Sequence, residues 1–318
     1  IGIIGYRFIH VLNRIGTWVL GIGIVIGFGY ILSHVQSDDF LTRGSFNLSG
    51  WLATVSLAAL WQIAFAPYVS DYSRYLPANV PVAATFWTTY LGSALGSSLS
   101  FVFGAVAVLA VPAGMDSMDA VKLATGAIGP LMLVLFLLSV ISHNALNLYG
   151  AVLSLITLVQ TFAYRWIPTA KSRAVLSLLV LLGCCVVAVF ASADFIGHFV
   201  DMVLVLLVVL VPWTAINLID FYAIHKGDYD IASIFKVDGG IYGRYNPQAL
   251  LAYAIGILVQ IPFMNTPLYV GPVSAHIDGA DLSWLVGLLI TSPLYYWLAT
   301  RDSAYRRRQT GAKLAASH

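Results

Sequence analysis

The stretch AIGPLMLVLFLLSVISHNALNLYGAVLSLITLVQTFA, residues 127–163, decides the class of this protein. It is apolar over almost its whole length. As one straight helix it would extend roughly 55 Å, which is much more than the hydrocarbon core of a bilayer at about 30 Å, so it has to tilt, bend or protrude. Its middle holds Ser142, His143, Asn144 and Asn147, so polar side chains occupy the depth at which polarity is most expensive.

Seven further stretches are long and apolar enough to cross a bilayer. Hydrophobic residues make up 59% of the 318 residues and charged residues only 9%, against roughly 25% in a soluble domain. We therefore predict an all-α polytopic membrane protein with a single transmembrane domain over residues 1–318. The eight predicted spans are Ile15–Leu32, Gly50–Pro67, Val82–Val111, Ala127–Ala163, Ala174–Ala193, Phe195–Ile219, Ala249–Val270 and Leu282–Thr300.

The basic residues lie almost entirely on one side of these spans. Of the 16 lysines and arginines, all except Arg43 and Lys122 fall in the N-terminal piece, in every second loop or in the tail. The positive-inside rule places that side in the cytoplasm. We therefore expect a multi-pass protein of the cytoplasmic membrane with both ends of the chain inside the cell. The net charge of +2 gives no indication of a nucleic-acid partner.

The cysteines and aspartates exclude several kinds of site. Cys184 and Cys185 are adjacent within one apolar span, a spacing that suits neither a disulfide framework nor a metal site. Every acidic residue is an aspartate, and the three that lie at span ends, Asp71, Asp201 and Asp220, are not at mid-membrane. The sequence contains no nucleophile–base pair, phosphate-binding loop or paired catalytic carboxylates, so we expect neither an enzyme nor a resident metal or cofactor.

The polar cluster in the long fourth span favours a ligand site. Asn144 and Asn147 are three residues apart and therefore share one helix face, with His143 beside it. Interhelical hydrogen bonds would account for a single buried asparagine. A cluster of this density instead indicates a polar ligand, because asparagine offers the paired donor and acceptor that match the edge of a nucleobase or another cyclic amide. His143 could respond to protons, or could be a neutral hydrogen-bonding group fixed by packing.

A flat heterocycle also needs an aromatic wall, and the second span supplies candidates. Trp61 lies there beside Gln62, with Phe65 one turn further on. We predict that the ligand stacks on Trp61, whose alternative role is simple packing, and that the helix breaks at Pro67. Asp71 and Arg74 at the cytoplasmic edge could form a helix-capping pair or part of an inner gate. The candidate gate or structural residues are therefore Pro67, Asp71 and Arg74.

Four segments resemble the purine–cytosine permeases, a family of nucleobase:cation symporters that also includes hydantoin and allantoin carriers. In the family's order they are FAPYVSDYSRYLP at 65–77, NALNLY at 144–149, NLIDFY at 217–222 and GGIYGRYN at 239–246. The resemblance covers essentially the whole chain. It implies the LeuT-like architecture of two inverted five-helix repeats, with substrate bound near the middle of the membrane, partly on discontinuous helices.

On this template the eight spans correspond to the fifth to twelfth helices of the family, and Ile1–Ile4 to the end of the fourth. The chain opens without a methionine or a signal peptide, so we expect N-terminal helices of the same polypeptide to precede it. In the family the first and third helices supply further substrate contacts and part of any sodium site.

The resemblance also implies roles for individual residues. The sixth-helix position that contacts substrate falls on Trp61 or Gln62, and the eighth-helix asparagine that hydrogen-bonds the base falls on Asn147. His143 and Asn144 match neighbouring substrate-contacting positions. The candidate substrate-binding residues are therefore Trp61, Gln62, Phe65, His143, Asn144 and Asn147.

One departure from the family concerns the coupled ion. Sodium-coupled relatives carry two adjacent hydroxyl residues on the eighth helix, whereas this chain has Ile141 and Ser142 there. The missing hydroxyl favours coupling to a proton over coupling to sodium. The cation-coupling candidates are Ser142 and His143.

These inferences converge on one expected function. We predict a secondary-active symporter that carries nucleobases, cytosine or purines or both, through the lipid bilayer by alternating access. One alternative is a carrier of a related ring amide, such as hydantoin, allantoin, uracil or a pyrimidine vitamin precursor. Another is a non-transporting membrane remnant or sensor.

Overall fold

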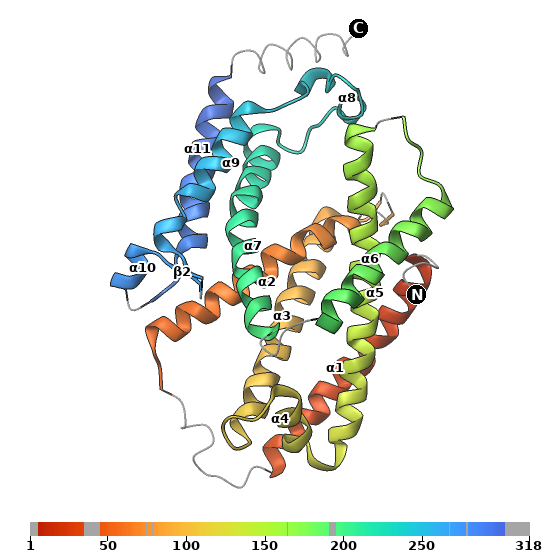
Figure 1. Cartoon of the computed structure of the whole chain (residues 1–318), viewed down its shortest axis with the longest axis vertical. Coiled ribbons are helices and arrows are strands. Elements are labelled where there is room, and N and C mark those ends of the chain that lie inside the picture. The colour runs from red at the N-terminus through yellow and green to blue at the C-terminus, as the bar shows by residue number, and fades with distance from the viewer. Residues whose placement is uncertain are drawn as a thin grey trace. The chain divides into compact units, whose positions relative to one another are not determined.

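A computed structural model gives the structure of the chain (Figure 1). It describes residues 6–34, 45–73, 76–77, 79–163, 165–190, 195–266, 268–277 and 279–302. The chain folds into two compact units, each assembled from two segments of sequence. The first unit comprises Ile1–Ser45 and Asp71–Ala191, and the second comprises Phe46–Ser70 and Ser192–His318.

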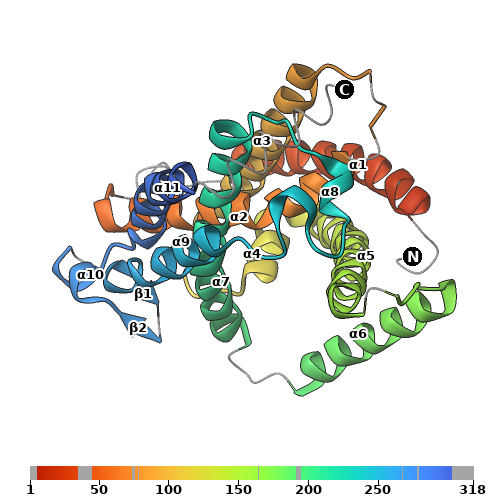
Figure 2. The same cartoon turned by 90° about the horizontal axis from the view of Figure 1, so that it is seen from above.

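The first unit is a helical bundle in which the long helix α5 is central. Its α-helices are α1 (Tyr6–His34), α3 (Val82–Leu109), α4 (Ser117–Ala124), α5 (Gly129–Phe162) and α6 (Ala170–Phe190). Viewed from above, α5 lies between α1 and α6 (Figure 2). The core forms where α1, α3 and α5 meet, around the buried side chains Ile31, Phe103 and Met132. Phe28 packs edge-on against Phe103, with the ring centroids 5.2 Å apart, a geometry that aromatic pairs prefer.

The second unit packs three helices closely and closes with a small hairpin. Its longer helices are α2 (Leu48–Ser73), α7 (Phe195–Leu218), α9 (Pro247–Leu258) and α11 (Ser283–Arg301). Of α2, the residues up to Ser70 belong to this unit. Shorter elements are the π-helical segment η3 (Ile219–Ile224), α8 (Ile231–Ile234), the strands β1 (Asn265–Thr266) and β2 (Tyr269–Val270), and α10 (Pro272–His276). The strands pair antiparallel.

Glycines allow α7, α9 and α11 to approach one another. A Cβ atom on Gly287 of α11 would lie 2.7 Å from both the Gln260 side chain and Val211 of α7, which is closer than any real contact. Gly256 of α9 is similarly crowded by Pro212. Small residues at helix contacts are the usual means of close packing in membranes, where lipid provides no hydrophobic drive between helices.

The Gln260 side chain donates to a backbone carbonyl of α7 that Pro212 leaves without a helical donor. Pro212 lies inside α7 and has no N–H, so the carbonyl of Val208, one turn earlier, has no helical donor. The fully buried Gln260 amide donates to that carbonyl at 2.9 Å and to the Gly256 carbonyl at 2.8 Å. A polar residue in an apolar core is thus explained by a proline on the neighbouring helix.

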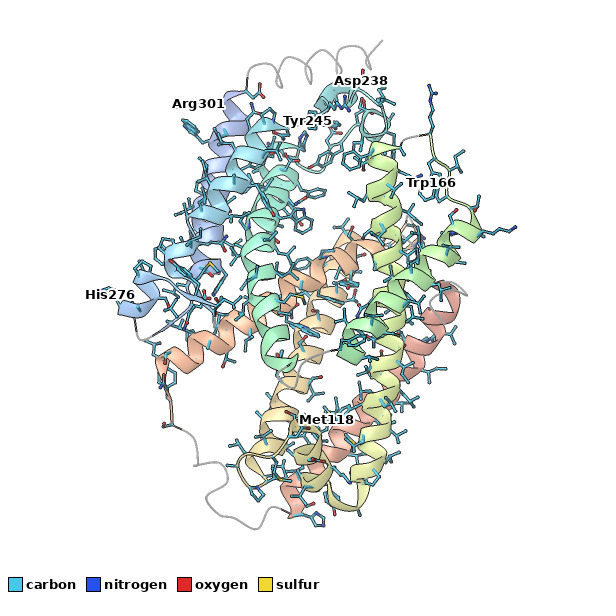
Figure 3. The ribbon with its side chains drawn as sticks, in the orientation of Figure 1. Met118, Trp166, Asp238, Tyr245, His276 and Arg301 are labelled. Carbon is cyan, nitrogen blue, oxygen red and sulfur yellow. The ribbon has the colours of Figure 1, made fainter. Side chains whose placement is uncertain are left out.

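Labelled side chains mark the ends of each unit (Figure 3). In the first unit, Trp166 and Met118 lie at opposite ends, and in the second, Asp238, Tyr245 and Arg301 lie at one end and His276 at the other. The cytoplasmic side of each unit stays a prediction.

The described residues confirm the all-α polytopic class, since they contain six helices long and apolar enough to cross a membrane. These are Asn13–His34, Leu48–Ser70, Val82–Leu109, Gly126–Phe162, Ala170–Phe190 and Met202–Ile224. Helix α5 has 34 residues and runs without interruption, about 51 Å at the usual rise per residue. Helix α11 follows the eighth predicted stretch, Leu282–Thr300, closely at both ends.

Two details of the predicted helices are wrong. The stretch 249–270 is not one helix, because α9 ends at Leu258 and the chain continues into the β1–β2 hairpin. Pro262 lies four residues later, in the 3₁₀ turn Ile261–Phe263, and a proline there cannot donate the α-helical hydrogen bond to the Leu258 carbonyl. Conversely, α2 does not break at Pro67 but continues to Ser73, since one lost hydrogen bond does not end a helix whose other bonds remain.

We predict that the variant Gln260→Met destabilises the purified protein by about 1–3 kcal/mol, because it leaves the Val208 carbonyl buried without a donor. In the Pro212→Ala background the same substitution should cost less, because the alanine restores the backbone N–H that proline lacks. The measurement is the unfolding midpoint of the four proteins of this cycle in detergent. Equal losses in both backgrounds would contradict this role for Gln260.

Candidate functional site

Helix α2 turns its candidate residues away from the core of the second unit. Leu60 is buried against α7, and Ser56, one turn earlier, accepts a hydrogen bond from Trp284 Nε1 of α11 at 3.0 Å. This anchored face fixes the rotation of the helix. Trp61 is 50% exposed and Gln62, which lies about 200° around the helix from Leu60, is exposed.

Phe65 extends the aromatic surface of this helix. It is half-buried, and its ring lies nearly parallel to that of Tyr68, with the centroids 6.1 Å apart. Trp61, Gln62 and Phe65 therefore form a polar and aromatic face of α2, on the side away from Leu60.

Helix α5 is oriented in the same manner by a contact with α1. The Ser142 hydroxyl donates to Asn13 Oδ1 at 2.5 Å, and Ala145 and Leu146 on the same face of α5 are buried. This face packs in the first unit, where α1 and α5 are in extensive contact. His143, Asn144 and Asn147 lie about 100°, 200° and 140° around the helix from Ser142, so they point away from α1. His143 and Asn144 are exposed, and Asn147 is half-buried.

The structure thus brings the predicted site residues together in two sets, one on each helix. Trp61, Gln62 and Phe65 belong to the second unit, whereas Ser142 and the three polar residues after it belong to the first. Their joint contact with one ligand stays a prediction.

The predicted gate residues are placed in part. Pro67 lies inside α2, and Asp71 lies in its last turn. The side chain of Asp71 and the whole of Arg74 lie outside the described residues, so the predicted pair is not tested.

The sequence did not predict that Asn13 accepts a hydrogen bond from Ser142. It lies two residues before the first predicted span, where an asparagine beside an arginine is expected to be solvated. Only the packing of α1 on α5 shows that its side chain holds a cation-coupling candidate.

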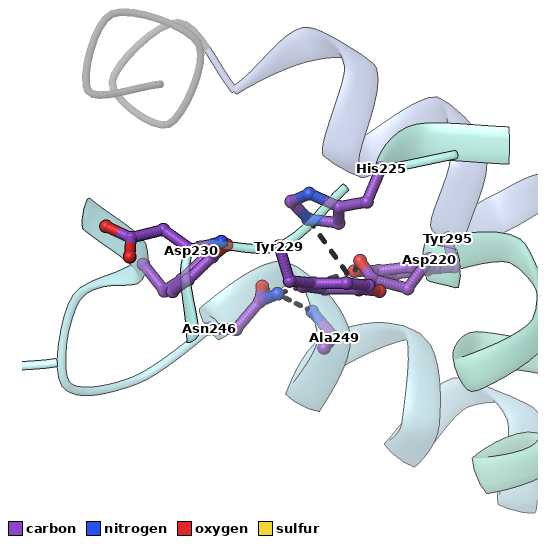
Figure 4. Close-up of polar contacts among 8 residues, drawn as sticks. Asp220, His225, Tyr229, Asp230, Asn246, Ala249 and Tyr295 are labelled. Carbon is purple, nitrogen blue, oxygen red and sulfur yellow. Dashed lines mark hydrogen bonds and ion pairs between the residues drawn. The ribbon is translucent and has the colours of Figure 1, made fainter. Parts of the chain in front are cut away.

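A second polar cluster, also not predicted, surrounds Asp220 at the end of α7 (Figure 4). One carboxylate oxygen of Asp220 accepts from Tyr229 at 2.7 Å, and the other accepts from Tyr295 of α11 at 2.6 Å. His225 Nε2 lies 3.7 Å from the Asp220 carboxylate, and Asn246 at the start of α9 donates to the Tyr295 hydroxyl at 3.4 Å. We call these five residues the Asp220 cluster. Asp220 stood in a recognisable motif, but its partners come from three later parts of the chain.

Hydrogen bonds join parts of the loop between Tyr229 and Asn246. The Asp230 backbone N–H donates to the Tyr242 hydroxyl at 2.7 Å, and the Ser233 hydroxyl donates to the Asp230 carboxylate at 2.6 Å. That hydroxyl lowers the pKa of Asp230, and burial raises the pKa of Tyr242. At neutral pH Asp230 is therefore charged and Tyr242 is neutral.

Apolar helices long enough to span a membrane that carry polar side chains at their centres are typical of membrane transporters. The chain matches the family described as "Permease for cytosine/purines, uracil, thiamine, allantoin" over residues 2–287. It therefore belongs to this permease family, whose members are transporters and not enzymes.

Two curated proteins are similar to the chain over most of its length. It is 33% identical over 297 residues, 93% of the chain and 65% of the relative, to a Bacillus subtilis protein named "Putative purine-cytosine permease YxlA". It is 23% identical over 325 residues, 92% of the chain and 59% of the relative, to "Purine-cytosine permease fcyB" of Emericella nidulans. The chain thus spans less than two thirds of each relative. The comparison with solved structures gave no match.

We predict a measurable coupling between Asn13 and Ser142. In a cycle of Asn13→Val and Ser142→Ala, the coupling free energy should be about 0.6 kcal/mol and at most about 1.7 kcal/mol, the range for hydrogen bonds between membrane helices. The unfolding midpoint in detergent reports it. Ser100→Ala is the control, because Ser100 bonds to its own helix, at Gly96. Additive effects of the Asn13 and Ser142 substitutions would contradict the contact.

Proposed function

We propose that this protein is a secondary-active transporter that carries nucleobases, cytosine or purines or both, by alternating access. Membership of the permease family is the observation that carries this proposal. The names of the two similar proteins, both purine-cytosine permeases, support the choice among the substrates of the family. The protein would lie in the cytoplasmic membrane with both ends of this chain inside the cell, as its basic residues indicate.

The exposed faces of α2 and α5 carry the chemistry that a nucleobase requires. The half-exposed indole of Trp61 offers a flat surface for stacking, with Phe65 beside it. The amide groups of Gln62, Asn144 and Asn147 each present a donor and an acceptor, which can pair with the amide-like edge of a base. Stacking would supply affinity and the amides would supply specificity.

A proton is the proposed coupled ion. Ser142 is the single hydroxyl at the position where sodium-coupled relatives carry two, and it already donates to Asn13. Hard metal cations are held by several oxygen ligands at once, so Ile141 in place of a hydroxyl weakens any sodium site. His143 is exposed on α5 next to Ser142 and is of the residue type that changes charge near neutral pH.

A carrier of another ring amide is the second candidate. The family description includes uracil, thiamine and allantoin besides cytosine and purines. The same stacking surface and amide groups would accept these molecules, since each contains a cyclic amide or a comparable heterocycle.

Uptake of labelled cytosine by cells without their own carrier tests the proposal, using the full-length protein. Unlabelled adenine, hypoxanthine, uracil, allantoin and hydantoin compete, at two pH values, with and without sodium. We expect competition by cytosine or purines and faster uptake at the more acidic external pH. Absence of cytosine and purine uptake by protein that reaches the membrane would overturn the nucleobase assignment, and uptake that requires sodium would overturn proton coupling.

We predict that Trp61→Ala raises the KM for the nucleobase by roughly 5-fold to 150-fold, because base stacking on an aromatic ring contributes about 1–3 kcal/mol. Trp61→Phe should retain most of the affinity. Trp87→Ala on α3 is the matched control, since Trp87 is similarly exposed at 55%. An unchanged KM in Trp61→Ala would show that this tryptophan only packs.

The variant Asn147→Ala should raise the KM at least roughly 10-fold, because the site would lose both a donor and an acceptor for the base. Labelled uptake in the same cells measures it, with surface expression as the control. If Asn147→Ala transports with wild-type affinity, the assignment of this asparagine to the substrate is wrong.

A further inference from the structure

Asp220 is the single acidic residue within the six candidate membrane-spanning helices of the described chain. It lies in the span Met202–Ile224, in the π-helical segment η3. Acidic side chains are rare within membrane-spanning helices and are candidates for functional sites, and π-helical turns are frequent at functional positions. Asp220 therefore calls for a functional explanation.

Two tyrosine hydroxyls hold the carboxylate of Asp220. The hydroxyls of Tyr229 and Tyr295 donate to different oxygens of the carboxylate, at 2.7 and 2.6 Å. Tyr295 is 1% exposed and sits in the core formed by α9 and α11, so one of these donors is fixed by packing. The carboxylate is thus held in a defined position at the end of α7.

His225 lies beside the Asp220 carboxylate. Its side chain is only 3% exposed, and its Nε2 lies 3.7 Å from the carboxylate. The imidazole stacks on Tyr229 with the ring centroids 4.4 Å apart, and Tyr242 meets it edge-on at 5.6 Å. Both aromatic contacts hold the imidazole next to the carboxylate, where a bound proton would complete an ion pair.

The other titratable groups near Asp220 and His225 are less suited to exchange a proton near neutral pH than this pair. Tyr229, Tyr242 and Tyr295 are phenols, which keep their protons at neutral pH. Asp228 and Asp230 follow in the loop, and Asp230 stays ionised because Ser233 donates to it. The cation nearest in sequence, Lys226, is exposed. The neighbouring charged or titratable groups are Lys226, Asp228, Tyr229, Asp230, Tyr242 and Tyr295.

We propose that the Asp220–His225 pair binds the proton that is co-transported with the nucleobase, at the cytoplasmic end of the second unit. The proposal rests on the proposed function and deepens it, since it assigns the coupling ion to a site that is separate from the substrate residues. One proton from water adds to the neutral imidazole of His225 and gives an imidazolium beside the carboxylate of Asp220. Its loss to cytoplasmic water restores the neutral imidazole, so no other reactant is needed.

Binding of one proton adds an ion pair between Asp220 and His225, at the start of the loop that follows η3. With the proton bound, opposite charges join η3 and His225, and with the proton released that attraction is lost while the tyrosine hydrogen bonds remain. The Asp220 cluster connects α7, α9 and α11 through Asn246 and Tyr295. Proton binding is therefore transmitted to three helices of the second unit.

The test uses the full-length protein in liposomes that contain a trapped pH dye, with labelled cytosine as the substrate. Two quantities are measured, the exchange of labelled for unlabelled cytosine and the number of protons that enter per cytosine. We expect His225→Gln and Asp220→Asn each to lower the protons per cytosine at least roughly 10-fold while exchange continues. Asp220→Asn retains the size and the hydrogen-bond acceptor of the side chain, so a merely structural role would leave the proton ratio unchanged.

Two control variants should keep the wild-type proton ratio. Asp228→Asn removes a neighbouring acid, and His276→Gln removes an exposed histidine of α10. If Asp220→Asn does not fold, Asp220→Glu should retain proton movement and His225→Gln should lose it. A wild-type ratio in either Asp220→Asn or His225→Gln would overturn the proposed proton site.

The failure of this proposal can be told apart from failure of the proposed function. Wild-type protein that moves protons with cytosine, together with unchanged ratios in the variants, refutes the site alone. Wild-type protein that takes up cytosine with no net entry of protons refutes proton coupling and with it this site. Absence of cytosine exchange by the wild-type protein refutes the nucleobase function itself.

Discussion

Lipid offers no hydrogen-bond partners, so each polar group inside a membrane-spanning helix has to be paired within the protein. At two places the structure pairs such groups by a hydrogen bond between neighbouring elements, whereas Gln260 Oε1 and the hydroxyls of Thr214 and Thr291 are buried without a hydrogen-bond partner among the described residues. The Gln260 amide supplies the donor that Pro212 withholds from α7, and the Ser142 hydroxyl donates to Asn13 of α1. The Ser142–Asn13 bond fixes the rotation of α5, and the contacts of Ser56 and Leu60 fix that of α2, so the faces that carry the candidate substrate residues follow from such contacts.

The helices could be predicted from the sequence because their signal is local. The length and apolar character of each stretch determine a span, and the predicted start of α3 at Val82 and of α7 at Phe195 agrees with the structure. The end of α9 could not be predicted by hydropathy, since apolar residues continue past Leu258 through the 3₁₀ turn Ile261–Phe263 to the strands β1 and β2. Backbone chemistry at Pro262 decides that end, whereas at Pro67 the remaining hydrogen bonds of α2 outweigh the loss of one.

The candidate site could be predicted only in its residues, not in its pairings. Polar side chains such as Asn144 stand out in an apolar stretch because their burial is expensive. Their partners, however, come from distant sequence, as Asn13 does for Ser142 at a separation of 129 residues and Tyr295 does for Asp220 at 75. No spacing rule along the chain contains such contacts, so the Asp220 cluster became visible only when α7, α9 and α11 were assembled.

In the proposed function a nucleobase contacts the candidate residues on α2 and α5. Protection of engineered cysteines checks this contact, in full-length protein from which the exposed Cys184 and Cys185 have been removed. Single cysteines at Gln62 and at Asn144 are labelled with a maleimide, with and without saturating cytosine, and a cysteine at the exposed Trp87 is the control. We expect cytosine to slow labelling at both positions and to leave the control unchanged. Unchanged labelling at both positions, in protein that still transports cytosine, would refute the proposed contact.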